Sequence, residues 1–74
     1  MKYPKLIEFG KNLRIARAIK GYSLEKLAMI ANLNPTHIAK IERAEMAPTL
    51  LTILALLEAL NVDFNTLVSY KKES

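Results

Sequence analysis

The stretch from residue 24 to residue 43 constrains this chain most strongly, because it has the pattern of two short helices joined by a tight turn. Its first half carries apolar side chains at the three- and four-residue spacing that lines one face of a helix: Leu24, Leu27, Ala28 and Ala31. Asn32 follows, and asparagine tolerates the left-handed conformation in which many helices end. Asn34 and Pro35 then supply a helix cap and a proline suited to the first helical position. The stretch therefore predicts a helix, a turn and a second helix.

The second helix of this pair is expected to bury only a small part of its surface. Ile38 and Ile41 give it a narrow apolar stripe. Five other residues face away from that stripe: Pro35, Thr36, His37, Ala39 and Lys40. A short helix that crosses its neighbour steeply and is polar on the outside can enter the major groove of DNA. This geometry is the main functional indication in the sequence.

Helix-start and helix-stop residues divide the whole chain into five expected helices with short connections. These span residues 4 or 5 to 20, 24 to 31, 35 to about 44, 50 to 60 and 64 to about 70. The residues expected to cap or end them are Gly21, Ser23, Asn34, Thr49, Asn61 and Asp63. No sustained alternation of apolar and polar residues predicts a strand. The expected fold class is all-α, a single domain of residues 1–74 with its core from about residue 6 to 70, and residues 71–74 are expected to fray.

The composition argues against several functional classes. The chain has 74 residues and no cysteine, so it has no disulfide, no thiolate metal site and no cysteine nucleophile. Its carboxylates are scattered, its two glycines form no phosphate-binding loop, and His37 has no partners at metal-ligand spacing. An enzyme, a metal site or a cofactor is therefore not expected. Because no run is long enough to span a bilayer and no signal peptide is recognisable, a cytoplasmic protein is expected.

The net charge of +4 is concentrated at the start of the chain. Residues 1–22 carry six lysines and arginines against one glutamate, a balance of +5, whereas residues 23–45 balance to zero and residues 46–74 to −1. A basic first helix beside a groove-reading helix suits the DNA backbone, where cations gain affinity by releasing counterions. On charge alone a solvated, lysine-rich surface is favoured, and the charge becomes informative only together with the helix pair.

Six short motifs occur in order along residues 9–68: Gly21–Tyr22–Ser23, Leu27–Ala28, Ile38, Ile41–Glu42–Arg43, Pro48–Thr49–Leu50 and Ala59–Leu60–Asn61–Val62. With these motifs the chain resembles the XRE, or Cro–C1, family of phage-repressor-like helix-turn-helix regulators, and it resembles restriction–modification controllers in size. The resemblance implies a five-helix, lambda-repressor-like DNA-binding domain. It also implies a transcriptional regulator whose partner is double-stranded DNA.

The resemblance further implies roles for individual residues. Arg17 and Glu42 match an ion pair that links the first and third helices of the family. Base contacts are implied for four residues of the third helix: Pro35, Thr36, His37 and Lys40. Phosphate contacts are implied for Ser23, Asn34 and Arg43, with Lys11 and Arg14 as further positioning contacts. The plain alternative for the polar residues of the third helix is a solvated side chain without a ligand.

Four positions depart from the family pattern. Leu24 stands where the family usually has a glutamine that contacts the DNA backbone. Pro35 replaces a polar base-reading residue and offers only apolar contact, for instance to a thymine methyl group. Ala44 replaces the usual glycine, so the third helix is expected to extend further. Glu45 lies in a loop that is usually basic, and it is expected to repel phosphate.

The fourth expected helix carries more apolar residues than a monomer needs. Five of them form its expected core face: Leu50, Ile53, Leu54, Leu57 and Leu60. Leu51 and Ala55 lie beyond that face, and Val68 and Tyr70 add apolar surface on the last helix. The surplus favours a homodimer through the last two helices over scattered exposed apolar residues. The expected interface residues are Leu51, Leu54, Ala55 and Val68.

Such a dimer would read the two half-sites of a pseudo-palindromic operator, about 34–36 Å apart along the DNA. A second function stays open, namely a protein-interaction module that keeps the fold but binds DNA weakly or not at all. Leu24, Glu45 and the apolar fourth helix favour this module. If it is correct, Lys40→Ala leaves function intact and Leu51→Glu abolishes it.

Overall fold

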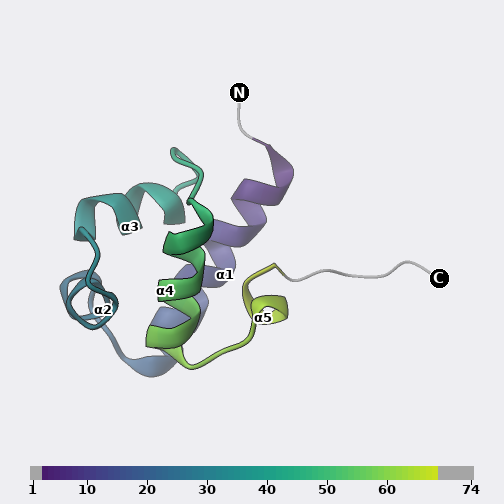
Figure 1. Ribbon diagram of the computed structural model, residues 1–74. Coiled ribbons are helices and arrows are strands. Elements are labelled where there is room, and N and C mark those ends of the chain that lie inside the picture. The colour runs from purple at the N-terminus through teal and green to yellow at the C-terminus, as the bar shows by residue number, and fades with distance from the viewer. Residues whose placement is uncertain (1–2, 69–74) are drawn as a thin grey trace.

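The computed structural model describes residues 3–68, and the regular structure in this range is entirely helical (Figure 1). The helices are α1 (Pro4–Lys20), α2 (Leu24–Ala31), α3 (Pro35–Glu42), α4 (Leu50–Leu60) and α5 (Phe64–Val68). The prediction of an all-α fold is confirmed. No helix in the described range is long and apolar enough to cross a membrane. The expected helix end at Tyr70 and the expected fraying of residues 71–74 lie outside the described residues.

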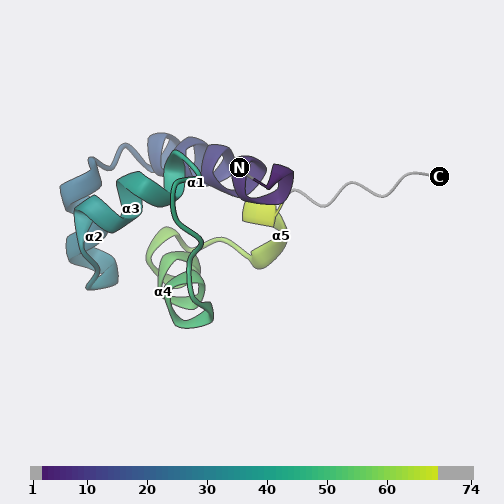
Figure 2. The same cartoon turned by 90° about the horizontal axis from the view of Figure 1, so that it is seen from above.

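The long helix α1 forms the back of the molecule in Figure 1 and packs against α3, α4 and α5. Helix α4 crosses in front of it, and α2 packs against both α3 and α4. Figure 2 shows the same arrangement from above, with α1 along one side and α4 on the opposite side. The pair α2–α3 therefore occupies one end of the molecule and α5 the other.

Local side-chain chemistry sets most of the helix ends. The side-chain oxygens of Ser23, Thr49 and Asp63 accept hydrogen bonds from the backbone N–H three residues further on, at 3.0, 3.1 and 3.2 Å. These bonds satisfy N–H groups that the first turn of a helix leaves without a partner. Helices α1, α2 and α4 each end on a left-handed residue: Gly21, Asn32 and Asn61, with φ of 74°, 57° and 56°. The predicted bounds of these three helices are confirmed.

The core is built from all five helices. Its buried members include Phe9, Leu13, Ala16, Leu27, Ala28, Ile38, Ile41, Leu56, Leu60 and Leu67. The apolar stripe predicted for α3 is the buried one, and Leu27 and Ala28 are the buried part of the predicted α2 face, while Leu24 and Ala31 are half-buried. The hydrophobic burial that holds so small a domain is therefore supplied by one core cluster to which every helix contributes.

The predicted core face of α4 is partly wrong. Leu56 is completely buried, although the prediction left it out, whereas Leu54 is 51% exposed and Leu50 is also exposed. Ile53 and Leu57 are half-buried against the core, and Leu60 is buried as predicted. Because nearly every residue of α4 is apolar, several helical faces fit the sequence equally well. Packing against α1 and α2 decides which of them faces inward.

The predicted extension of α3 to about Ala44 is also wrong. The helix ends at Glu42, and Ala44 adopts the left-handed conformation, with φ of 60°. The N–H of Ala44 donates to the carbonyl of Ile41 at 3.0 Å, and the N–H of Glu45 donates to the carbonyl of Lys40 at 2.8 Å. This is the hydrogen-bond pattern of a Schellman helix end, normally completed by glycine. The two bonds, and burial of the alanine methyl group, offset a left-handed strain of about 1–2 kcal/mol.

Gly10 lets α1 approach the end of α3 at backbone distance. A Cβ atom at this position would lie 2.4 Å from the carbonyl oxygen of Ile41 and 2.6 Å from that of Glu42. Only glycine leaves room for this contact, because both obstacles are backbone atoms. The close approach fixes the end of α3 against α1.

Candidate nucleic-acid interface

The outward side of α3 is polar and accessible, as a groove-reading helix requires. Thr36, His37 and Lys40 are exposed, and Pro35 is half-buried at the first helical position. Ile38 on the opposite side is completely buried, which anchors the helix to the core. The structure thus brings the predicted base-contact residues onto one exposed surface.

Asn34 fixes the start of α3. Its side-chain oxygen accepts hydrogen bonds from the backbone N–H groups of Thr36 at 2.7 Å and His37 at 3.4 Å. Pro35, which lies between Asn34 and Thr36, has no backbone N–H that needs an acceptor. Both bonds are accepted by the carbonyl oxygen of the Asn34 side chain, so the N–H groups of its amide take no part in them. The cap therefore sets the backbone positions of the first two outward-facing residues of the helix.

Arg17 ties α3 to the rest of the domain. Its Nε and Nη2 donate to the two carboxylate oxygens of Glu42 at 2.7 and 3.1 Å. The two side chains are only 17% and 6% exposed. The hydrogen bond to Glu42 raises the pKa of Arg17 above its ordinary value, so this side chain stays charged. A bidentate arginine–carboxylate pair restrains both position and orientation.

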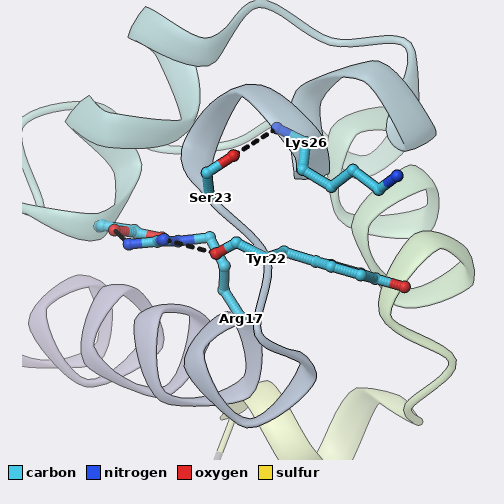
Figure 3. A network of polar contacts seen from close by, with 5 residues as sticks. Arg17, Tyr22, Ser23 and Lys26 are labelled. Carbon is cyan, nitrogen blue, oxygen red and sulfur yellow. Dashed lines mark hydrogen bonds and ion pairs between the residues drawn. The ribbon is translucent and has the colours of Figure 1, made fainter.

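The same guanidinium also holds the turn before α2. Arg17 Nη1 donates to the backbone carbonyl of Tyr22 at 2.9 Å. Figure 3 shows Arg17 reaching this carbonyl, with the Ser23–Lys26 cap of α2 immediately above it. One side chain therefore aligns the start of α2 with the end of α3. The contact with Tyr22 was not predicted, because a backbone acceptor leaves no signal in the residue type.

The predicted phosphate-contact residues fall into two groups. Ser23 and Asn34 are exposed at the starts of α2 and α3. Lys11 and Arg14 are exposed on α1, and together with Arg43 they line one hollow beside the end of α3. The structure thus brings together, beside the end of α3, basic residues that are about thirty positions apart in the sequence.

Arg43 forms an ion pair with Glu45. Its Nε and Nη2 donate to the two carboxylate oxygens of Glu45 at 3.0 and 3.1 Å. The hydrogen bond to Glu45 raises the pKa of Arg43 above its ordinary value. Both side chains are more than two-fifths exposed. The prediction treated Glu45 as a charge that repels phosphate, whereas the structure shows that it also occupies the neighbouring arginine.

Leu24, at the position where related proteins were expected to have a glutamine, is half-buried against the core. Its side chain therefore contributes to packing at the start of α2. Within residues 3–68 no group of three histidine, cysteine, aspartate or glutamate side chains is placed to hold a metal ion.

The predicted interface residues on α4 and α5 differ in exposure. Leu51 is 78% exposed and Leu54 is also exposed, while Ala55 and Val68 are half-buried. The prediction did not include Leu50 and Phe64, which are exposed apolar residues of the same two helices. For Leu50 the sequence signal was the unusual apolar content of α4, whereas Phe64 on α5 had no such signal. These large apolar side chains are exposed on α4 and α5, helices other than α3.

The helix arrangement and the anchored, outward-facing α3 define a helix-turn-helix domain. Residues 13–67 match the family HTH_3, described as a helix-turn-helix. Because the match covers most of the chain, the protein belongs to this family of XRE-type, DNA-binding transcriptional regulators.

Proteins from two bacteria are similar to it. The control protein C.SmaI of Serratia marcescens is 39% identical over 60 residues, which cover 81% of this chain and 71% of that protein. The HTH-type transcriptional regulator SutR of Escherichia coli (strain K12) is 35% identical over 57 residues, covering 77% of this chain but 32% of that protein. Both are named for a role in regulation, one as a control protein and the other as a transcriptional regulator.

A solved structure supports the same assignment. The crystal structure of the restriction-modification controller protein C.AhdI from Aeromonas hydrophila matches with a TM-score of 0.84. The two chains are 35% identical, and the match covers 88% of this chain and 98% of that one. The similarity therefore extends over nearly the whole of a small controller protein.

Proposed function

We propose that the protein is a sequence-specific transcriptional regulator that places α3 in the major groove of a pseudo-palindromic operator. The observation that carries this proposal is the exposed polar surface of Thr36, His37 and Lys40 on a helix held at both ends. A rigidly held helix loses little conformational entropy when its side chains contact base edges. The likeness to C.SmaI and C.AhdI favours a controller, acting in the cytoplasm where the operator is accessible.

In this proposal Thr36, His37 and Lys40 contact bases, and Pro35 offers an apolar surface to a thymine methyl group. Ser23 and Asn34 bind phosphate at the starts of α2 and α3. Their side-chain oxygens already accept backbone N–H groups, which leaves the serine hydroxyl proton and the asparagine amide as donors. Lys11, Arg14 and Arg43 add positioning contacts on the backbone from the hollow beside α3.

The test is selection of bound duplexes from a random DNA library at two salt concentrations. We expect a symmetric motif that persists at the higher salt, because base contacts depend on salt less than phosphate contacts do. Lys40→Ala should relax base preference at one position of that motif, by about 1–3 kcal/mol. Lys20→Ala, which removes an equal charge at the exposed end of α1, serves as the control.

We further propose that the regulator is a homodimer joined through α4 and α5. Leu50, Leu51, Leu54 and Phe64 supply exposed apolar area that a monomer of this size rarely maintains. Leu51→Glu should convert dimers to monomers in sedimentation experiments and leave only weak binding to half-sites. Ile19→Glu is the matched control, because Ile19 on α1 is 80% exposed and Leu51 is 78% exposed. A Leu51→Glu variant that stays fully dimeric would refute this interface.

The second candidate, a protein-interaction module, is favoured by the contact between Glu45 and Arg43 and by the apolar α4 surface. It predicts no enriched motif in the library selection, or only salt-sensitive binding without sequence preference. In that case Lys40→Ala has no functional effect, whereas Leu51→Glu still abolishes association with the partner.

A further inference from the structure

We propose that Glu45 competes with DNA phosphate for Arg43 and thereby lowers the affinity of the protein for every DNA sequence. This inference rests on the proposed DNA-binding function and adds a residue that tunes it. Arg43 follows directly after α3, and Glu45 lies two residues further on in the loop.

The geometry of the contact is that of phosphate recognition. Two parallel hydrogen bonds, at 3.0 and 3.1 Å, join one edge of the Arg43 guanidinium to both oxygens of the Glu45 carboxylate. Arginine binds a phosphate group through the same pair of N–H donors. While the carboxylate occupies this edge, a phosphate group cannot use it. Glu45 is thus a competing ligand within the protein itself.

The backbone holds Glu45 in place. The left-handed conformation of Ala44 turns the chain back on itself after Arg43. The N–H of Glu45 then donates to the carbonyl of Lys40 at 2.8 Å, which ties the residue to the last turn of α3. Only the side-chain torsions of Glu45 and Arg43 are left to order when the ion pair forms. The local concentration of the carboxylate around Arg43 is therefore high.

The residues around Arg43 are basic, and the carboxylate of Glu45 acts against their attraction for phosphate. Arg43 shares a hollow with Lys11 and Arg14, so this edge of the interface is basic. The carboxylate that lines this hollow belongs to Glu42, which is paired with Arg17. Removal of the Glu45 carboxylate would release Nε and Nη2 of Arg43 from these two hydrogen bonds, beside the cations of Lys11 and Arg14.

The consequence is a lower affinity that does not depend on base sequence. Binding with Arg43 on phosphate requires displacement of Glu45, and binding without Arg43 loses one backbone contact. Since phosphate contacts carry no sequence information, operator and unrelated DNA should be affected equally. The device weakens binding to all sites without altering the choice of bases.

The experiment compares Glu45→Gln with Glu58→Gln, which removes the same charge from an exposed position on α4. Dissociation constants are measured for the selected operator and for a scrambled duplex over a range of salt concentrations. We expect Glu45→Gln to tighten binding to both duplexes about fivefold more than Glu58→Gln does. The slope of log K against log salt should steepen by up to about 0.9, the value of one additional phosphate contact.

Arg43→Ala completes the design, alone and combined with Glu45→Gln. If Glu45 acts through Arg43, Glu45→Gln in the Arg43→Ala background has no more effect than Glu58→Gln. The inference is overturned if Glu45→Gln behaves like Glu58→Gln, or if its effect persists without Arg43. In either case the wild-type protein still binds its operator, so the proposed function stands. Absence of duplex binding by the wild type and all variants would overturn the proposed function and this inference together.

Discussion

Helices α3 and α4 face their surroundings with opposite chemistry, although each is anchored by buried aliphatic side chains. The exposed residues of α3 are polar: Thr36, His37 and Lys40. The exposed residues of α4 include three leucines: Leu50, Leu51 and Leu54. A polar helix surface can exchange water for base edges, whereas an apolar one gains by contact with another apolar surface. The comparison teaches that one small domain separates its two proposed partners, DNA and a second copy, onto different helices.

The two helices also differ in how they are held. Polar contacts restrain α3 at its start through Asn34 and at its end through Arg17 and Glu42. α4 has a Thr49 cap but is otherwise positioned by burial of leucines. Hydrogen bonds and ion pairs are directional, and burial is not. Substitutions that remove polar contacts or buried side chains can therefore test whether α3 is held by directional contacts and α4 by burial.

The largest expected effect concerns the inner side of α4. Leu56→Ala should lower the free energy of unfolding by about 3 kcal/mol, because it opens a cavity at a completely buried site. Leu54→Ala, two residues earlier and 51% exposed, should change it by less than about 0.5 kcal/mol. Urea denaturation at a concentration where the protein is monomeric measures both. Equal losses of unfolding free energy would show that α4 is rotated about its axis relative to the orientation described above.

The next effect concerns the anchor of α3. Arg17→Ala should cost about 3 kcal/mol, at the lower end of the range for a broken buried pair, because Glu42 would be left charged and nearly buried. Arg14→Ala removes an exposed arginine from the same helix and should be nearly neutral. Thermal and urea unfolding of the two variants provide the measurement. If Arg17→Ala is as mild as Arg14→Ala, polar contacts do not hold α3.

A smaller effect is expected where α1 meets α3. Gly10→Ala should destabilise the fold by about 2 kcal/mol, because the added methyl group would overlap two backbone carbonyls. Gly21→Ala meets no atom within 4 Å and should cost about 1 kcal/mol through its left-handed backbone alone. Calorimetric unfolding separates the two costs. A reversed order would mean that α1 and α3 part more easily than their close approach indicates.

The smallest effect on stability compares the caps of the two helices directly. Asn34→Ala and Thr49→Ala should each cost about 1 kcal/mol, since each removes the acceptor for a helix-start N–H. Only Asn34→Ala should also weaken operator binding, because it loosens the first turn of α3. Parallel unfolding and DNA titrations test this. Equal losses of DNA affinity would contradict the separation of functions between α3 and α4.

The parts of the site that could be predicted from the sequence are those with a periodic pattern or a family motif. The outward-facing position of Thr36, His37 and Lys40 followed from the spacing of Ile38 and Ile41. The pairing of Arg17 with Glu42 came from the family pattern. The contacts of Arg17 with Tyr22 and of Arg43 with Glu45 were missed, because a backbone carbonyl and a loop conformation carry no periodic signal.

At Ala44 the local preference of the residue and the tertiary packing favour different conformations. Alanine favours helix, so its identity predicted a longer α3. The close contact at Gly10, the buried methyl group and the Schellman hydrogen bonds instead end the helix at Glu42 and turn the chain. A local preference of less than about 1 kcal/mol is readily outweighed by such tertiary packing.

The sequence by itself determined where most helices begin and end, since a cap such as Ser23 or Asn34 acts on N–H groups two or three residues away in any fold. It also determined the polar face of α3, where only one apolar stripe was available. Tertiary structure decided which leucines of α4 are buried and how closely α1 approaches α3. These features depend on how helices distant in sequence roll and approach one another, and no local interaction specifies that.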